Sequence, residues 1–170
     1  VTFSHATWLR PSISGHAPLQ AGMYMTEAYK LRPKMDRPNG DHKLDNQGWV
    51  GRPAAAVSLN CAEDVSFTRC TFEHNASTGL DYHLYIKGGN VDRCTFRDMG
   101  GTGILAGGFS PEGYEAHLPY DPTDERIICT GLSITNNLIT DVTNDDWGCV
   151  GIGAGFVKDI KICNNEISEV

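Results

Sequence analysis

Two short segments of the chain carry acidic side chains in settings that could support acid–base chemistry. Asp145 and Asp146 are adjacent and precede Trp147, whereas Asp81 lies within Gly79–His83. Adjacent carboxylates repel each other, which favours keeping a proton on one of them, as a general acid requires. The indole of Trp147 offers an apolar face to a sugar ring. Hydrolysis of a glycosidic bond needs a proton donor and a second carboxylate, so Asp81, Asp145 and Asp146 are the candidate catalytic residues.

The elements that position these acids come from a phrase that the chain repeats. The segment Arg69–Phe72 (Arg-Cys-Thr-Phe) returns 24 residues later as Arg93–Phe96, and looser copies occupy Ile134–Ile139 and Ile162–Ile167. Self-similarity at a period in the twenties is typical of stacked coils rather than of a globule. Nineteen glycines also suit a turn-rich β protein.

Each coil contains three short segments of alternating apolar residues, such as Val57–Leu59, Val65–Phe67 and Cys70–Phe72. Three strands separated by turns, and then repeated, predict an all-β fold, a three-sided parallel β-solenoid. Because successive side chains of a strand point to opposite faces, one apolar set should point inward and stack. This set is Val65, Phe67, Phe72, Ile134, Ile139, Ile160, Ile162 and Ile167.

One bend of the coil carries Cys70, Cys94, Asn137 and Asn165 at equivalent positions. An inward Asn can bond the backbone of the turn and the Asn of the next coil, which satisfies buried polar groups. We therefore interpret the two asparagines as structural. Cys70 and Cys94 should stack about 4.8 Å apart with parallel side chains, a poor geometry for a disulfide, and we expect free, buried thiols.

The regular pattern divides the chain into three parts. They are residues 1–8, the end of an incomplete coil; residues 9–53, a loop insertion; and residues 54–170, the β-helix coils, with a second insertion at 109–128. The first part is recognised because Phe3 and His5 match Phe72 and His74. Both ends cut through the pattern, so we expect the sequence to be a fragment of a longer helix.

Composition argues against several classes of partner. The 170-residue chain has a formal charge of −7 and no basic run, which argues against nucleic acid. No stretch approaches about 18 apolar residues, so no membrane span is expected. No C-x-x-C pair is present to suggest zinc. Gly100–Gly103 lacks the lysine of a phosphate-binding loop.

With three short strands per coil, an inward Asn at the bend and Gly-apolar strand starts, the chain resembles right-handed, single-stranded parallel β-helices of the pectin-lyase type. The segments LQAGMYMTEAYKLRPKMDRP, STGLDYH, GGFSPEG and NDDWGCVGI resemble bacterial polysaccharide-degrading glycoside hydrolases of this fold, active on fucosides or xylan. The resemblance implies acid catalysis on a polysaccharide or oligosaccharide bound along the outer face of one sheet, often under long insertions. It also implies export: a secreted, periplasmic or cell-surface protein, here bacterial.

Strand periodicity places Leu80 and Tyr82 inward, which leaves Asp81 and His83 on an outer face. The turn that holds Asp145 precedes the equivalent strand two coils further on. Two coils correspond to about 9.6 Å at about 4.8 Å each. This separation is nearer to the roughly 6.5–9.5 Å between the carboxylates of inverting glycosidases than to the roughly 5 Å of retaining ones.

Candidate substrate-binding residues lie beside these acids or on the two insertions, where loops could reach over a cleft. They are His83, Trp147, Glu112, His117, Tyr120, His16, Tyr24 and Arg52. Arg52 would suit a carboxylated sugar, because a guanidinium pairs with a carboxylate through two hydrogen bonds.

Two other functions fit the same residues. A polysaccharide lyase would use Ca²⁺, for which Asn144, Asp145 and Asp146 offer oxygen ligands, with His83 as the base. A glycan-binding or structural solenoid would use the acids for solvation alone. Apart from this possible Ca²⁺, no cofactor is expected.

Overall fold

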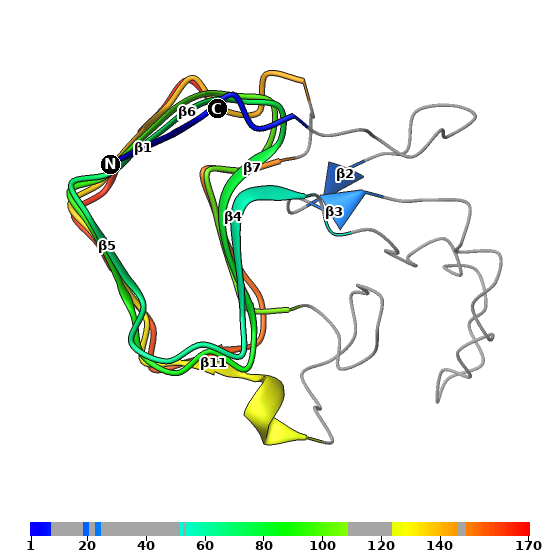
Figure 1. Cartoon of the computed structure of the whole chain (residues 1–170), viewed down its shortest axis with the longest axis vertical. Helices are drawn as coiled ribbons and strands as arrows, with labels where there is room; N and C mark the ends of the chain where they lie inside the picture. Colours follow the sequence, from blue (N-terminus) through cyan, green and yellow to red (C-terminus); the bar gives the residue numbers. More distant parts are fainter. Residues whose placement is uncertain (8–18, 21–22, 25–51, 53, 109–123, 146–148) are drawn as a thin grey trace, which may run out of the picture.

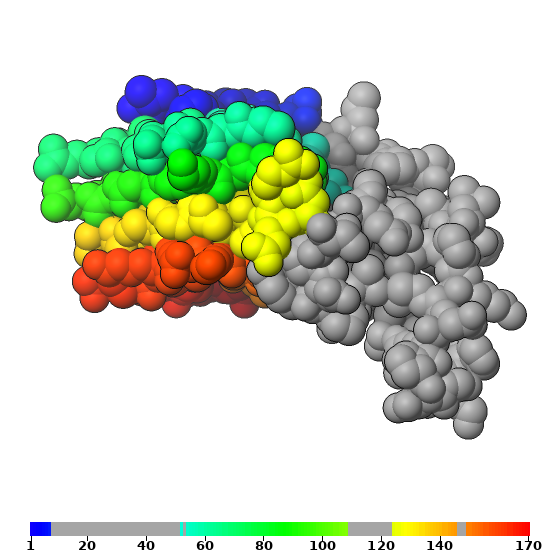
Figure 2. Space-filling view, turned by 90° about the horizontal axis from the view of Figure 1, so that it is seen from below, coloured from blue at the N-terminus to red at the C-terminus, as the bar shows by residue number. Residues whose placement is uncertain are grey.

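The computed structural model describes residues 1–7, 19–20, 23–24, 52, 54–108, 124–145 and 149–170. Within them the chain is almost entirely β, and its coils stack through parallel strand pairing. Figure 1 looks along the stack, so that successive coils superimpose, and Figure 2 shows the same coils from the side as layers. The stacked-coil architecture predicted from the repeat is confirmed.

Three parallel sheets form the main sides of the stack. Sheet 1 contains β1 (Thr2–Ser4), β6 (Thr71–Asn75), β9 (Thr95–Met99), β13 (Leu138–Thr140) and β17 (Glu166–Ser168). Sheet 2 contains β4 (Ala55–Asn60), β7 (Thr78–Leu84), β10 (Ile104–Ala106) and β14 (Ile152–Ala154). Sheet 3 contains β5 (Ser66–Thr68), β8 (Asn90–Asp92), β12 (Ser133–Thr135) and β16 (Lys161–Cys163).

Smaller elements complete the described chain. They are the parallel pair β11 (Cys129–Thr130) and β15 (Val157–Lys158), the antiparallel pair β2 (Leu19–Gln20) and β3 (Met23–Tyr24), and the 3-10 helix η3 (Glu125–Ile127). Asp124 caps η3 by accepting a hydrogen bond from the backbone N–H of Arg126. The β2–β3 pair falls within the first predicted insertion, and η3 within the second. No helix of the described residues is long and apolar enough to cross a membrane.

The inward residues stack in register from coil to coil. Phe3 pairs with Phe72, and Phe72 with Phe96, with ring centroids 4.7 and 4.6 Å apart and nearly parallel planes. On sheet 3 the same holds for Phe67, Val91 and Ile134. Stacked aromatic and aliphatic side chains of this kind remove large apolar areas from water and supply the main driving force for folding.

Two members of the predicted inward set are exposed. Ile162 pairs in register with the buried Ile134, and Ile167 with the buried Ile139, but they are 44% and 48% exposed. Their strands, β16 and β17, are the last in their sheets, so each has a neighbouring coil on one side only. The predicted stacking register is confirmed, and the exposure follows from the missing second neighbour.

The bend between sheets 3 and 1 is held by the residues predicted to hold it. The side chain of Asn137 accepts a hydrogen bond from the backbone of Cys94 (2.8 Å) and donates to Asn165 Oδ1 (2.9 Å) and to the carbonyl of Val91 (3.0 Å). One coil earlier, Cys94 Sγ accepts from the backbone N–H of Cys70 at 3.4 Å. Cys70 and Cys94 are buried free thiols, and burial raises the pKa of Cys94.

The corner between sheets 1 and 2 requires glycine. A Cβ on Gly79 would lie 2.8 Å from the carbonyl oxygen of Gly103, and one on Gly103 would lie 2.7 Å from that of Gly151. It would also approach the inward side chains of sheet 1, since Ile139 Cγ2 is 3.0 Å from the Gly103 position. The glycine that precedes an apolar residue at the start of these strands therefore has a steric cause: the coil turns too tightly here to accommodate a side chain.

At this same corner each strand of sheet 1 has a residue with left-handed backbone, either next to last in the strand or directly after it. These residues are His5, His74, Asp98, Asp141 and Glu169, with φ between 48° and 59°. The register of sheet 1 stacks them in one column, which we call the corner ladder. His and Asp are among the non-glycine residues that adopt this conformation most readily. The turn geometry thus lines one edge of the molecule with ionisable side chains.

The steric origin of the glycine column can be tested with Gly103→Ala. We expect a loss of about 1–3 kcal/mol in the free energy of unfolding, because the neighbour that must move is backbone. Gly131→Asn is a control without a steric clash: the added Cβ meets nothing closer than 3.7 Å, and Asn is among the side chains that best tolerate the left-handed backbone (φ +69) at this position. Urea unfolding of both variants should separate them, and equal losses would contradict the steric explanation.

The bend bonds predict an ordering of two substitutions at one position. Asn137→Ala should cost about 1–3 kcal/mol, because the buried N–H of Cys94 loses its acceptor. Asn137→Cys should cost less, since the chain itself uses Cys94 as the acceptor one coil earlier. Thermal and urea unfolding provide the comparison. If the two variants were equally destabilised, the acceptor role assigned to this side chain would be wrong.

Candidate functional site

Asp81 lies on β7 between Leu80 and Tyr82, both fully buried in the core. Its side chain points the other way and meets Arg52. Arg52 Nε donates to Asp81 Oδ2 at 2.7 Å and Nη2 donates to Oδ1 at 2.6 Å, and Nη2 also donates to the carbonyl of Gly107 at 3.0 Å. Two parallel bonds of this kind are the strongest arrangement between a guanidinium and a carboxylate.

The side chain of Asp81 therefore points away from the core, as predicted, but it is not exposed to solvent. It is 2% exposed, and Leu105, its register partner on β10, is fully buried as well. The outer face of sheet 2 is thus buried at this level, and the charge of Asp81 is balanced by Arg52 rather than by water. Arg52, predicted to meet a carboxylated sugar, is bonded to a carboxylate of its own chain.

The thiol that the structure describes beside this pair, that of Cys129, is not a thiolate nucleophile. Cys129 Sγ bonds the carbonyl of His83, the other outward residue predicted on β7, at 3.2 Å. Burial raises the pKa of the Cys129 thiol to about 11, against an opposing effect of Arg52. At neutral pH the thiol stays protonated, which makes it inert. His83 itself is half-buried.

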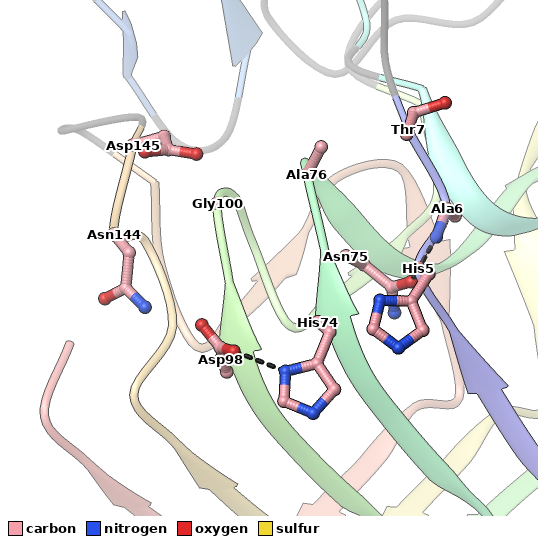
Figure 3. A pocket seen from close by; sticks show the side chains of 10 residues that line it. All are labelled: His5, Ala6, Thr7, His74, Asn75, Ala76, Asp98, Gly100, Asn144 and Asp145. Atoms are coloured by element: carbon pink, nitrogen blue, oxygen red, sulfur yellow. Dashed lines mark hydrogen bonds and ion pairs between the residues drawn. The ribbon is translucent and has the colours of Figure 1, made fainter.

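Asp145 lies elsewhere, beside the corner ladder. The turn that carries it is attached by three successive backbone bonds: Thr143 to the carbonyl of Gly101, Asn144 to that of Met99, and Asp145 to that of Gly100, at 3.0–3.1 Å. These bonds place Asp145 over the connection between β9 and β10 (Figure 3). Its exposed side chain faces a cavity.

The cavity has a volume of about 360 Å³ and is lined by residues from successive coils that present both polar and apolar surface. Its lining residues are His5, Ala6, Thr7, His74, Asn75, Ala76, Asp98, Gly100, Asn144 and Asp145. Figure 3 shows His5, His74 and Asp98 in a row along the corner ladder, with Asn144 and Asp145 beyond them on the next turn. Ligand sites are commonly concave regions of this size.

Within the cavity His74 and Asp98 form a hydrogen-bonded pair. His74 Nδ1 lies 2.5 Å from Asp98 Oδ2, and the ring of His5 stacks on that of His74 with centroids 5.1 Å apart. This pair was not among the sequence candidates. The repeat held the signal, because matching Phe3, Phe72 and Phe96 also aligns His5, His74 and Asp98 two positions later.

The structure brings Asp145 together with His74 and Asp98, and Asp81 together with Arg52. Asp81 is not among the residues lining the cavity. Strands β7 and β14 are two steps apart in sheet 2, as the coil count predicted. Six candidates lie outside the described residues: Asp146, Trp147, His16, Glu112, His117 and Tyr120. For Tyr24 the structure describes the backbone, which forms part of β3.

Across the described residues no group of three or more His, Cys, Asp or Glu side chains could hold a metal ion. The Ca²⁺ ligands considered for a lyase include Asp146, which lies outside those residues. The Ca²⁺ site therefore stays a prediction.

Comparison with solved structures identifies a similar protein named glycoside hydrolase. The two chains are 55% identical and superpose with a TM-score of 0.84. The match covers 100% of this chain and 28% of the other, so this chain spans little more than a quarter of that protein's length. No family model matches the chain, and no curated protein matches it.

The buried pair of Asp81 and Arg52 predicts a strong coupling. Asp81→Asn should cost about 3–5 kcal/mol, because it removes a buried carboxylate charge that Arg52 binds through two hydrogen bonds. The double variant Asp81→Leu with Arg52→Met should recover most of this loss, since Leu105 already fills the equivalent position on the next coil. Urea unfolding of the variants measures both effects. Additive losses in the double variant would show that the pair is not coupled.

Proposed function

We propose that this chain is part of a glycoside hydrolase that cleaves a polysaccharide or oligosaccharide by acid–base catalysis. The observation that carries the proposal is the 55% identity, over the whole of this chain, to a protein named glycoside hydrolase. Because a polysaccharide is too large to enter a cell, we also propose that the protein works outside the cytoplasm, as a secreted, periplasmic or cell-surface enzyme.

The fold proposed for the whole protein is a right-handed, three-sided parallel β-helix of the pectin-lyase type. Its support is the set of three main parallel sheets and the bonded bend between two of them, where Asn137 and Asn165 form a ladder. Figure 1 shows the outline that these sides make when viewed along the stack.

Within this mechanism, we assign the proton donor to the turn at Asp145 and Asp146. Asp145 is exposed and lines a cavity of about 360 Å³, so a sugar and solvent can both reach it. A general acid must exchange protons with water in every turnover, which an exposed carboxyl can do.

Asp81 takes a different part in the proposal. Its two bonds to Arg52 fix the carboxylate on the outer face of sheet 2, and it can meet a sugar only if those bonds open. We therefore assign to Asp81 a positioning role beneath the substrate surface.

Activity of the full-length protein tests these roles. Asp145→Asn or Asp146→Asn should lower kcat by about 10²–10⁴-fold, the usual contribution of a general acid, without lowering Tm. Asp81→Asn should lower Tm as well as activity. Release of reducing sugar from xylan and from fucose-containing polysaccharide measures hydrolysis.

Three results would contradict the proposal. If the Asp145→Asn and Asp146→Asn variants both hydrolysed the substrate at the wild-type rate, the assignment of the proton donor to this turn would be wrong. Release of unsaturated products absorbing in the ultraviolet, in place of reducing sugar formed by addition of water, would identify a polysaccharide lyase. Failure of every substrate would leave the glycan-binding or structural solenoid.

A further inference from the structure

We propose that a single water molecule is bound inside the protein at the corner between sheets 1 and 2, where it bridges the hydroxyls of Ser77 and Thr78. Thr78 is the first residue of β7, and Ser77 directly precedes it. Neither residue was a candidate from the sequence. The site needs no substrate, so it is independent of the proposed hydrolysis.

Two neighbouring hydroxyl groups are buried here. Ser77 is 3% exposed and Thr78 is 0% exposed. Among the groups that the structure describes, neither Ser77 Oγ nor Thr78 Oγ1 has a hydrogen-bond partner. A hydroxyl removed from water without a new partner is destabilising, so buried polar groups are almost always bonded to protein or to ordered water. Two adjacent exceptions indicate a site for a small ligand that forms hydrogen bonds.

The space beside these hydroxyls fits one water molecule. Both residues line a cavity with a volume of about 10 Å³. A buried water needs a cavity on the order of 10–15 Å³ and two to four polar partners. The cavity therefore suits a water and is far too small for a sugar ring. Its other lining residues are Ala6, Thr7, Ala54, Ala55, Ala56 and Asn75.

Asn75 offers the water a third partner. Its Oδ1 accepts from the backbone N–H of Ala6 at 3.0 Å, and its Nδ2 donates one hydrogen to the carbonyl of Phe3 at 3.3 Å. An amide nitrogen carries two hydrogens, so the second can be donated to the water. Together with the two hydroxyls, each of which can donate and accept, this gives the number of partners that a buried water needs.

The next coil shows how the same corner is built without such a site. Thr102 occupies there the position of Thr78, and its Oγ1 accepts from the backbone N–H of Val150 at 3.3 Å. The counterpart of Ser77 is Gly101, where an added Cβ would lie 3.0 Å from the backbone carbon of Ser77. That coil thus pairs its one hydroxyl with backbone and has a tightly packed glycine in place of the other.

The position of the cavity gives the water a structural role. Thr7 precedes the first predicted insertion and Ala54 follows it, and both line the cavity. Figure 3 draws the larger cavity beside the corner ladder, to which Ala6, Thr7 and Asn75 also belong. A water between the two hydroxyls and Asn75 therefore connects the start of β7 with the wall of that larger cavity, at the base of the insertion.

A high-resolution crystal structure of the protein tests the site directly. We expect one ordered water within about 2.5–3.0 Å of both Ser77 Oγ and Thr78 Oγ1. In the variant Thr78→Val the water loses a partner, so its occupancy should fall. Well-defined electron density at this corner without a water between the two hydroxyls would overturn the proposal.

The sign of a stability change provides a second test. Thr78→Val keeps the shape of the side chain and removes the hydroxyl. If the water is bound, the variant leaves the water and Ser77 short of a partner, and Tm should fall by about 2–8 °C. If the hydroxyl is unpaired, the variant removes a desolvated polar group, and Tm should rise. A rise in Tm would therefore also overturn the proposal.

Two further variants complete the stability test. Thr68→Val is the matched control: it is the same exchange at an exposed residue of β5, and it should change Tm by less than about 2 °C. The double variant Ser77→Ala with Thr78→Val should lose less than the sum of the two single losses, because both hydroxyls serve one water. Additive losses would show that they share no ligand. If Thr78→Val does not fold, the crystal structure of the wild type decides alone.

Discussion

Hydrogen bonding between successive coils is the constraint on which the rest of this structure depends. At the bend before sheet 1, the N–H of Thr95 bonds the carbonyl of Cys70, that of Leu138 bonds Cys94, and that of Glu166 bonds Asn137, all at 2.9–3.0 Å. Because the bonds repeat in one register, residues at the same place in each coil must share a direction and a backbone conformation. A single coil cannot change its turn without breaking bonds to both neighbours.

This constraint explains why polar and ionisable groups gather in columns. A turn that needs left-handed backbone selects residues that tolerate it, and the corner between sheets 1 and 2 uses two histidines, two aspartates and a glutamate. Stacking then brings groups from different coils into contact, such as His74 and Asp98, which are 24 residues apart in the sequence. The turns that the fold requires thus place ionisable side chains side by side on the surface, for structural reasons alone.

Sequence reasoning reached the features that follow from the register. The strands, the inward stack through Phe72 and Phe96, and the Asn bend could all be predicted, because each is repeated and each is local. The pairing of Asp81 with Arg52 could not, since Arg52 belongs to a stretch outside the repeat whose path no periodicity describes. The exposure of Ile162 was missed because periodicity gives the direction of a side chain but not whether another coil covers it.

The two carboxylates found from sequence differ in what their surroundings permit. Asp81 is surrounded by a guanidinium and by the buried face of sheet 2, and it is 2% exposed. A group in such a place contributes to stability but cannot readily exchange a proton with water. Asp145 is held in its turn by a backbone hydrogen bond to the carbonyl of Gly100, and its side chain lines a cavity. For the proposed hydrolysis, a general acid must recover its proton after every bond cleaved, and this requirement is the reason that we propose the turn at Asp145, rather than the strand at Asp81, as the donor.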